Sequence, residues 1–452
     1  MAIQTHAAAT ALLKRVYFPG IRDQLNNETP GLGILERVGK ERWSGSEVRA
    51  AARTGRNRSY RPTGSSNESA ALPTAGRQTF DNYVINCVLM HGTGGLTAFG
   101  AAATQGSEAA FEQMLKAEVD GLIAAAKKAR EIDFYNLPTG VLGRVDSVGG
   151  GGVVTLDQTQ SLDVTESMGN RYFSTGQLVD IVDVTGNAIH QTGVSVSAID
   201  SANRTNITLS ATAGAAANDL IVRSGTIAIN NPDAPVSASP IEAAFAFAGL
   251  DYLIDDTSTM VASNLMMNFE LDTLQGITRG ASTGWAKSSV VDLNGADLTR
   301  THLHNAIYLM EERGATYPDV ILTHRSVQLA IADLMVGDQR YAPQEFPGGF
   351  KASALVFNGG DRDVPILVSR ECPYDRAYFL DLDAIKMFVL QDFELIETDG
   401  SVLRQSGTGD AWQFSYRMFG NMGTLQSNAA AKLVRIGGAD DTFGASGRIY
   451  DF

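Results

Sequence analysis

The sequence lacks the features of a disulfide scaffold, a membrane protein or a secreted protein. Its 452 residues include only two cysteines, Cys87 and Cys372; these are too few for a disulfide framework and lack metal-ligand neighbours, so we expect two buried thiols. No stretch reaches the roughly 18 consecutive apolar residues of a membrane-spanning helix. Residues 1–10 lack the basic start and long apolar stretch of a signal peptide. The sequence therefore predicts a cytosolic product.

Basic residues are also scarce. The 36 Lys+Arg against 50 Asp+Glu give a formal net charge of −14, and such a surface repels nucleic acid, which disfavours a dedicated DNA-binding protein. It does not exclude a container whose wall must avoid sticking to the genome inside. The 44% of hydrophobic residues is typical of a globular protein with a buried core. The length predicts two or three domains.

Signatures of metal and nucleotide chemistry are missing. There is no Walker-type phosphate loop, no HExxH and no CxxC pair. The closest approach to a metal site is His302, His304 and Glu311. His304 and Glu311 lie seven residues apart on one expected helix and share a face, whereas His302 points elsewhere. We favour a surface or interface helix here, and we expect no metal and no cofactor.

Two acidic pairs have ordinary explanations. Asp381 and Asp383 in FLDLDAI alternate on an expected strand, and such a pair is more often a solvated face or a turn than a catalytic dyad. Asp255 and Asp256 in LIDDTST are typical of a turn or a helix start. The sequence therefore predicts no catalytic residue.

A long hairpin is the first large feature. Strand-like legs at 47–54 and 78–90 enclose a polar stretch, RNRSYRPTGSSNESAALPTAG, which is either a surface loop or an arm that orders against a neighbouring subunit. Five arginines gather on it, and they could form a solvated loop, a nucleic-acid contact or a docking site on an acidic neighbour. Tyr60 is the one aromatic residue among these arginines. Single-stranded nucleic acid is usually bound by basic residues together with stacking aromatic side chains, so the nucleic-acid hypothesis is weakened. Charge complementarity favours the third, so we predict inter-subunit docking by Arg49, Arg53, Arg56, Arg58 and Arg61.

Three further regions follow along the chain. Apolar residues at three-to-four-residue spacing predict a helix over 107–132, a rod of roughly 40 Å. Short β-branched segments separated by turn residues over 141–229 predict an inserted all-β barrel or sandwich. Residues 242–375 alternate helix and strand patterns, with a helix over 299–313 that Gly314 is expected to stop. Residues 376–436 are rich in strands, and Asp399-Gly400 is a hairpin signal.

The order of these parts resembles the major capsid protein of tailed bacteriophages, whose architecture is called the Johnson fold. That family has an N-terminal arm, an extended hairpin loop, a spine helix in a peripheral domain and a compact axial domain. Here the arm holds VYFPGIRDQLNNETPGLGILERV, the tip of the extended loop ends in ALPTAGRQTF, and the spine helix is SEAAFEQMLKAEVDGLIAAAKKAREID. The axial domain begins at GLDYLIDDTS and continues through TRTHLHNAIYLMEERG and YPDVILTHRSVQLAI.

The resemblance implies an α+β chain of five parts. These are an arm (1–44), an extended loop (45–90), a peripheral domain (91–138 and 376–452, with the spine helix at 107–132), an inserted β module (139–235) and an axial domain (236–375).

The function implied is that of a structural subunit and not an enzyme. Copies would assemble as pentamers and hexamers into the icosahedral head shell, which expands when DNA is packaged. The shell would enclose double-stranded DNA without sequence-specific binding and without a membrane. A scaffolding protein and a portal protein at one vertex are implied partners, and a cement protein is allowed. The location would be the virion, after assembly in the host bacterial cytoplasm.

Two departures from the family affect this expectation. Some members join neighbouring subunits by an isopeptide bond from a lysine in the extended loop. This chain has no lysine between Glu41 and Leu115, so we predict no such bond. Other members carry a fused N-terminal scaffolding segment. Here the arm begins almost at Met1, so we expect a separate scaffolding protein unless the chain is a processed product.

Three alternatives stay open on the sequence. An encapsulin-type nanocompartment shell protein shares the fold but is generally shorter, and a β module would be atypical. A phage or cell-surface β-rich adhesin would explain the β module but not the long helix. A hydrolase with an unrecognised site has no supporting constellation.

Overall fold

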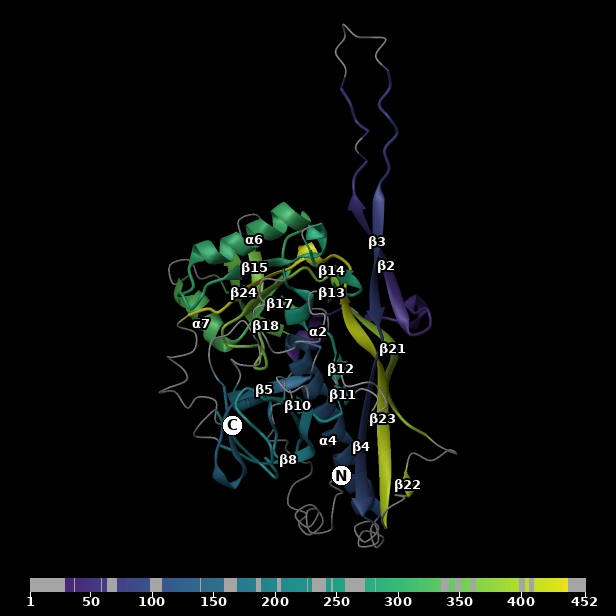
Figure 1. The fold of residues 1–452 in the computed structure, drawn as a ribbon, viewed down its shortest axis with the longest axis vertical. Coiled ribbons are helices and arrows are strands. Elements are labelled where there is room, and N and C mark those ends of the chain that lie inside the picture. Colours follow the sequence, from purple (N-terminus) through teal and green to yellow (C-terminus); the bar gives the residue numbers. More distant parts are fainter. Residues whose placement is uncertain are drawn as a thin grey trace.

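The computed structural model has mixed helix and strand content, with a hairpin projecting from one end (Figure 1). A long sheet and helix run the opposite way, and a barrel and an α/β sheet lie beside them. The described residues are 29–35, 37–57, 59–62, 71–97, 108–138, 140–157, 169–183, 188–200, 205–225, 227–229, 241–244, 247–256, 273–280, 282–334, 341–345, 351–358, 363–397, 403–405 and 410–437.

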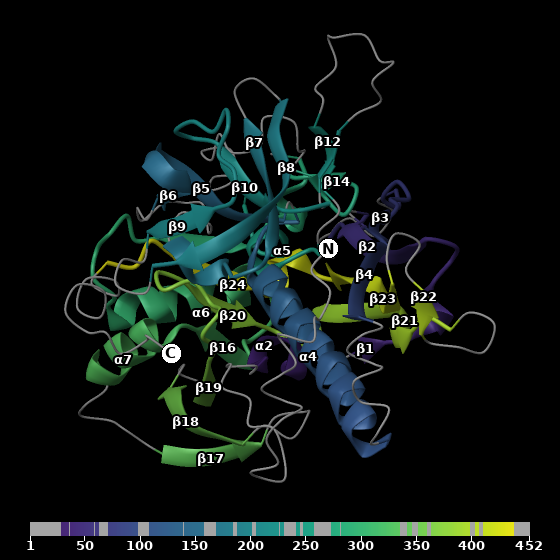
Figure 2. The same ribbon diagram turned by 90° about the horizontal axis from the view of Figure 1, so that it is seen from below.

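The long sheet is built on one extended strand, β23 (Ala411–Thr424), which pairs antiparallel with β4 (Val88–Thr97) and β21 (Ile385–Leu395). The edges are β1 (Arg37–Val38), parallel to β21, and β22 (Arg404–Gln405). Helix α4 (Glu108–Tyr135) packs along β4 and runs away from the centre of the molecule (Figure 2). The expected helix is thus present and three residues longer at its end. No described helix has the length and apolar character needed to cross a membrane.

A closed six-stranded barrel follows α4. Its strands are β5 (Val141–Val148), β6 (Val153–Leu156), β7 (Leu178–Asp183), β8 (Ala188–Ile199), β9 (Asn206–Leu209) and β10 (Leu220–Arg223), and β10 closes on both β5 and β7. Alternating side chains fill the interior, among them Val145, Val154, Ile181 and Ile207, because successive strand residues point to opposite faces. The chain leaves through the pair β11 (Ile227–Ile229) and β12 (Ile241–Ala244).

The α/β part is a seven-stranded sheet in the order β15-β24-β20-β16-β19-β18-β17. Its strands are β15 (Ser289–Asp292), β16 (Val320–Thr323), β17 (Tyr341–Glu345), β18 (Lys351–Asn358), β19 (Asp363–Val368), β20 (Ala377–Leu380) and β24 (Ala431–Val434). Helices α6 (Arg300–Gly314) and α7 (Arg325–Leu334) cover it with Leu303, Met310, Val327 and Ile331. Beside the sheet lie α2 (Pro30–Ile34), α5 (Leu250–Leu253) and the short pair β13 (Thr273–Leu274) and β14 (Ile277–Thr278).

Two strands differ from their expected place. The sequence grouped all strands of 376–436 with the peripheral domain, yet β20 and β24 pair with β16 and β15 inside the α/β sheet. Both are buried along their whole length, which suits a strand covered on two faces by helices or core. Only β21, β22 and β23 belong to the long sheet.

Smaller differences have local causes. Helix α6 ends one residue later than expected, because Ala315 and not Gly314 adopts the left-handed conformation, at φ 52°. Gly314 serves close packing, since a Cβ there would lie 2.5 Å from the Asn428 carbonyl oxygen. Cys372 is buried as expected, but Cys87 is only partly covered where β3 ends and β4 begins. Asp399-Gly400 lies outside the described residues.

A buried cluster of charges joins α5 to the α/β sheet. The Asp251 carboxylate receives Arg376 Nη1 at 2.5 Å and Lys432 Nζ at 3.2 Å. Lys432 Nζ also lies 3.1 Å from Asp255 Oδ1, so Asp255, which we expected at a turn or a helix start, is a buried ion-pair partner. Burial opposes ionisation of Asp251, but the two cations outweigh it and hold its pKa below the ordinary value.

We predict that Asp251→Asn destabilises the subunit by about 3–5 kcal/mol, because two buried cations lose half of their anionic partners. Asp292→Asn is the matched control. Asp292 pairs with Arg435 at the partly exposed end of β15, so its loss should cost less than about 1 kcal/mol. Urea unfolding of the dissociated subunit measures both variants, and equal losses would contradict the prediction.

The Asp251→Asn variant also tests how the stability of the subunit depends on pH. Because the folded pKa of Asp251 is lowered, its contribution is fully present above the unfolded pKa of about 3.9 and is lost as pH falls through the folded value. The stability difference between the native chain and Asp251→Asn should therefore shrink as pH falls below about 4. If the difference in unfolding free energy between the two proteins stays constant as pH falls below about 4, the charge of Asp251 does not contribute to stability.

Candidate assembly surfaces

The hairpin is formed by β2 (Glu47–Gly55) and β3 (Thr79–Asn86), paired antiparallel from Glu47 with Asn86 to Gly55 with Thr79. Its base is anchored. Val48 and Ile85 are buried against Phe388 of β21. The Tyr83 hydroxyl lies 3.1 Å from Ser427 Oγ, and its ring meets Trp285 edge-on at 5.7 Å. The rest of the hairpin extends away from the body (Figure 1).

The outer half of the hairpin carries exposed cations. Arg53, Arg56 and Arg61 are exposed and form no ion pair within the described ranges. Arg49 is also exposed, but its guanidinium pairs with Glu47 Oε1 on the same strand, at 2.6 Å from Nη2. Arg58 lies outside the described residues. The structure therefore places three of the five predicted docking arginines where a neighbour could reach them.

Exposed apolar side chains accompany these arginines, and sequence reasoning noted only Tyr60. The exposed fractions of Tyr60, Leu72 and Phe80 are 88%, 91% and 66%. Phe80 stands directly opposite Arg53 in the hairpin register, so the two share a face. Exposed apolar side chains that gather on one part of a surface are typical of an interaction site. In QTFDNYVIN, Tyr83 and Ile85 share the buried face of the strand, and Phe80 lies on the opposite face. This alternation could have predicted from the sequence that Phe80 is exposed.

The described end of the arm is held by α4. Glu131 Oε1 accepts from Gly31 N–H at 2.9 Å, and Glu131 Oε2 accepts from Leu32 N–H at 3.0 Å. Ser369 Oγ donates to the same carboxylate at 3.1 Å. These amides open helix α2, where backbone N–H groups have no partner within the helix. Burial raises the pKa of Glu131, and nearby Glu371 adds to this effect, while the three hydrogen bonds oppose it.

The barrel is bound to two other parts of the molecule. Arg223 at the end of β10 forms an ion pair with Asp133 of α4 at 2.8 Å. Arg171 places its guanidinium over the Tyr374 ring at 4.9 Å and donates to the Arg370 carbonyl at 2.6 Å. Its Nη1 lies 3.1 Å from His324 Nε2. These contacts give the barrel a fixed orientation on the body.

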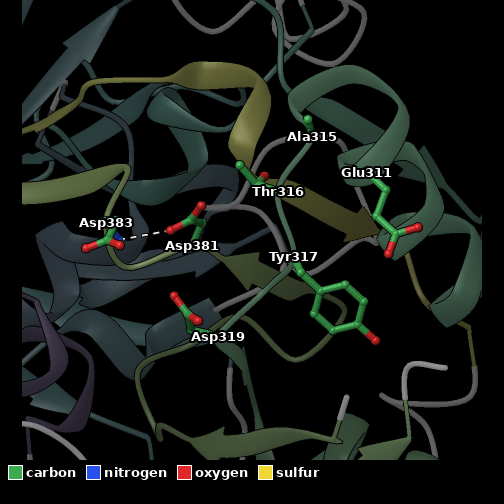
Figure 3. Close-up of a pocket in the computed structure, with 7 residues that line it drawn as sticks. All are labelled: Glu311, Ala315, Thr316, Tyr317, Asp319, Asp381 and Asp383. Carbon is green, nitrogen blue, oxygen red and sulfur yellow. Dashed lines mark hydrogen bonds between the residues drawn. The ribbon is translucent and has the colours of Figure 1, made fainter. Parts of the chain in front are cut away.

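An acidic hollow of about 680 Å³ lies between α6 and the turn after β20 (Figure 3). Asp381 and Asp383 are on that turn and not on a strand, and Asp381 Oδ1 accepts from Asp383 N–H at 2.9 Å. Asp319 Oδ2 accepts from Leu382 N–H at 3.0 Å. Burial raises the pKa of Asp381, and Asp319 and Asp383 contribute. These carboxylates shape the turn, as short acidic side chains commonly do.

The other candidates for chemistry have structural roles. His302 completes the N-terminal cap of α6, where its Nδ1 accepts from Thr299 N–H at 3.3 Å. No group of three or more His, Cys, Asp or Glu side chains in the described part of the chain is arranged to hold a metal ion.

One pattern escaped the sequence reasoning: residues 280–284 read GASTG, which fits the GxSxG pattern of some hydrolases. That pattern requires a strand-to-helix turn with a histidine at hand. Here it joins the two-residue strand β14 to a 3₁₀ turn, and the Thr283 hydroxyl donates to the Thr278 carbonyl at 2.5 Å. Within the described residues, Ser282 makes no hydrogen bond to a histidine.

Comparison with known proteins gives one family match. The model of the SU10 major capsid protein family matches residues 188–420, which is 233 of the 452 residues. No curated protein matches.

Three solved structures illustrate what the chain is similar to. One is the cyanophage A-1(L) capsid asymmetric unit, 12% identical over 96% of this chain and 99% of that chain, with a TM-score of 0.47. Another is the capsid of the native GTA particle, 10% identical over 96% and 100%, with a TM-score of 0.46. The third is the holo-SrpI encapsulin complex from Synechococcus elongatus PCC 7942, 8% identical over 97% of each chain, with a TM-score of 0.44.

We predict that Gly31→Ala loosens the arm. A Cβ at Gly31 would lie 2.6 Å from Phe134 Cε1 and 2.8 Å from Glu131 Oε1, so α2 must shift and its bonds to Glu131 weaken. Gly121→Ala is the control, because nothing lies within 4 Å of its Cβ and alanine favours an exposed helix position by about 1 kcal/mol. Amide hydrogen exchange should rise at Leu32 in the first variant only.

Proposed function

Because this chain belongs to the SU10 major capsid protein family, we propose that its hairpin, arm and barrel are the surfaces through which copies close into an icosahedral head. The chain is a major capsid protein of a tailed bacteriophage, a structural component of the virion and not an enzyme, as the sequence predicted. The family match favours this assignment over the adhesin and the encapsulin alternatives.

The projecting hairpin carries the proposal. Its base is locked to the body by Val48, Tyr83 and Ile85, while its outer part presents arginines and large apolar side chains to solvent. The rest of the chain is acidic enough to bring the net charge to −14. A second copy of the same chain therefore offers a complementary surface. Oppositely charged surfaces steer association and disfavour wrong registers, and repeated use of one interface builds closed rings.

The docked hairpin joins subunits without a covalent bond in this proposal. The chain has no lysine between Glu41 and Leu115, so the hairpin lacks the amine that an isopeptide bond requires. Contacts of Arg53, Arg56 and Phe80 with a neighbour must then supply the stability. Such an interface weakens at high salt, because exposed ion pairs are screened.

The remaining surfaces and partners complete the proposal. Pentamers and hexamers form the lattice, a separate scaffolding protein guides its curvature, a portal protein occupies one vertex, and a cement protein is a further candidate partner. The barrel, held by Arg171 and Arg223, projects outward and bolsters contacts between copies, or binds host surfaces. DNA is enclosed without sequence-specific binding, which the acidic surface favours. Assembly takes place in the host bacterial cytoplasm.

We predict that the triple variant Arg53→Glu, Arg56→Glu and Arg61→Glu lowers the yield of closed shells at least about tenfold, the effect of losing roughly 1.4 kcal/mol per interface. A matched control changes Arg144, Arg325 and Arg404 to Glu, on the barrel, α7 and β22, with the same change in net charge. Both variants are expressed with the scaffolding protein, and shells are counted by negative-stain electron microscopy.

The control separates docking from a general effect of charge. If both variants lose shells equally, net charge is responsible and the hairpin has no special role. If the hairpin variant assembles with unchanged yield and unchanged salt sensitivity, the docking proposal is wrong.

A further inference from the structure

A short turn of the body is hydrogen-bonded to the base of the hairpin. Strands β13 and β14 are joined by the two-residue turn Gln275–Gly276, which lies beside the base of β3 (Figure 1). The Gln275 carbonyl accepts from Val84 N–H of β3 at 2.8 Å. The outer edge of the two-stranded hairpin is therefore bonded to the body at Val84, in addition to the apolar contacts of its base.

The backbone of this turn has a conformation that glutamine rarely adopts. Gln275 has φ 50° and Gly276 has φ 86°, so both lie in the left-handed region. Two-residue turns of this kind favour Asn-Gly, Asp-Gly or Gly-Gly, and other residues are strained there. Such strain persists only where the surrounding contacts determine the conformation. Gln275 is buried, so its contacts must provide that constraint.

Gln275 connects three parts of the molecule. The orientation of a side-chain amide follows from its hydrogen-bond partners. Both atoms of this amide are satisfied when Nε2 donates to the Thr424 carbonyl at 2.9 Å and Oε1 accepts from Thr424 N–H at 3.0 Å. Thr424 is the last residue of β23, the central strand of the long sheet. The Gln275 N–H donates to the Tyr252 hydroxyl of α5 at 3.3 Å. One residue thus joins the hairpin, the long sheet and α5.

These hydrogen bonds restrict the direction of the hairpin more than its apolar contacts do. Apolar packing of Val48 and Ile85 on Phe388 is non-directional, whereas a hydrogen bond weakens steeply as its angle departs from linearity. Strand β3 continues outward from Val84 to Thr79, over about 17 Å at roughly 3.4 Å per residue. A tilt of about 10° at Val84 would therefore move Thr79 by roughly 3 Å. Such a displacement breaks a hydrogen bond or an ion pair with a neighbour.

We infer that Gln275 is a positioning residue, which sets the direction in which the hairpin leaves the subunit before any neighbour is present. It joins Val84 to Thr424 through its backbone carbonyl and its side-chain amide. The docking side chains of the hairpin are then held in one direction, so less ordering is needed when a neighbour binds. The importance of this for assembly rests on the proposed docking function, but the positioning is a property of one subunit.

The first test measures the direction of the hairpin in dissociated subunits. Spin labels are attached at Phe80→Cys on the hairpin and at Tyr308→Cys on α6, both exposed positions. Cys87 is changed to Ser, and Cys372 stays because it is buried. Pulsed electron paramagnetic resonance then gives the distribution of distances between the two labels. The native chain should show one narrow distribution.

Gln275→Ala and Gln275→Gly should each broaden this distribution by about 3 Å, the displacement that a tilt of about 10° produces. Both changes remove the amide that is bonded to Thr424. The matched control is Gln191→Ala, which removes an amide that donates to the Ala213 carbonyl of the barrel at 3.2 Å. The control should leave the distribution unchanged.

The two Gln275 variants separate positioning from stability. Glycine adopts a positive φ without strain, whereas alanine does not, so Gln275→Gly should unfold at a higher urea concentration than Gln275→Ala. Equal broadening in both variants, despite their different stability, supports the inference. Broadening in the less stable Gln275→Ala alone, or in neither variant, would show that the amide does not set the direction of the hairpin.

The second test uses the unmodified subunit, so a folding defect of a variant cannot affect it. The Val84 amide, which donates to the Gln275 carbonyl, should exchange with deuterium as slowly as the amides bonded within the hairpin. Fast exchange at Val84 would overturn the inference. Neither test involves shells, so a failure of hairpin docking during assembly would leave both results unchanged.

Discussion

The last two turns of α4 are the point at which the parts of this subunit meet. Within them, Lys128 pairs with Glu371 from the α/β part, Glu131 binds the arm, and Asp133 binds the barrel through Arg223. Between these side chains, Arg130 contacts the methionines of the long sheet. A rigid helix transmits the position of one attachment to the next, because its backbone bonds fix the angle between successive side chains. The relative orientation of arm, barrel and sheets therefore depends on one short stretch.

Charge is used differently in the interior and at the surface. Inside, Asp251, Asp255, Arg376 and Lys432 satisfy one another around α5 and the middle of the α/β sheet. Such a cluster stabilises one arrangement specifically, because separating any member leaves an unpaired charge in a medium of low dielectric constant. On the hairpin, the arginines face water and are available to a second molecule. The buried cluster stabilises the folded subunit. The exposed arginines suit an interface that is used many times, once between each pair of neighbouring copies.

Local patterns predicted much of the architecture, with identifiable limits. The apolar stripe over 107–132, the β-branched segments of the barrel and the two strand legs of the hairpin all correspond to observed elements. The assignment of β20 and β24 to the peripheral domain was wrong, because strand pairing between distant segments leaves no mark on local periodicity. The family match then identified the class of protein that the order of parts had indicated.

The sequence by itself determined where helices, strands and the basic hairpin lie, because these depend on neighbours within a few residues. It also showed the charge imbalance and the absence of a lysine on the hairpin. Only the tertiary structure decided which charges are partners. Asp255 looked like a turn residue, yet it lies buried beside Lys432, and Glu131 holds amides 100 residues away. Such contacts join residues that chain topology brings together, so spacing in the sequence could not reveal them.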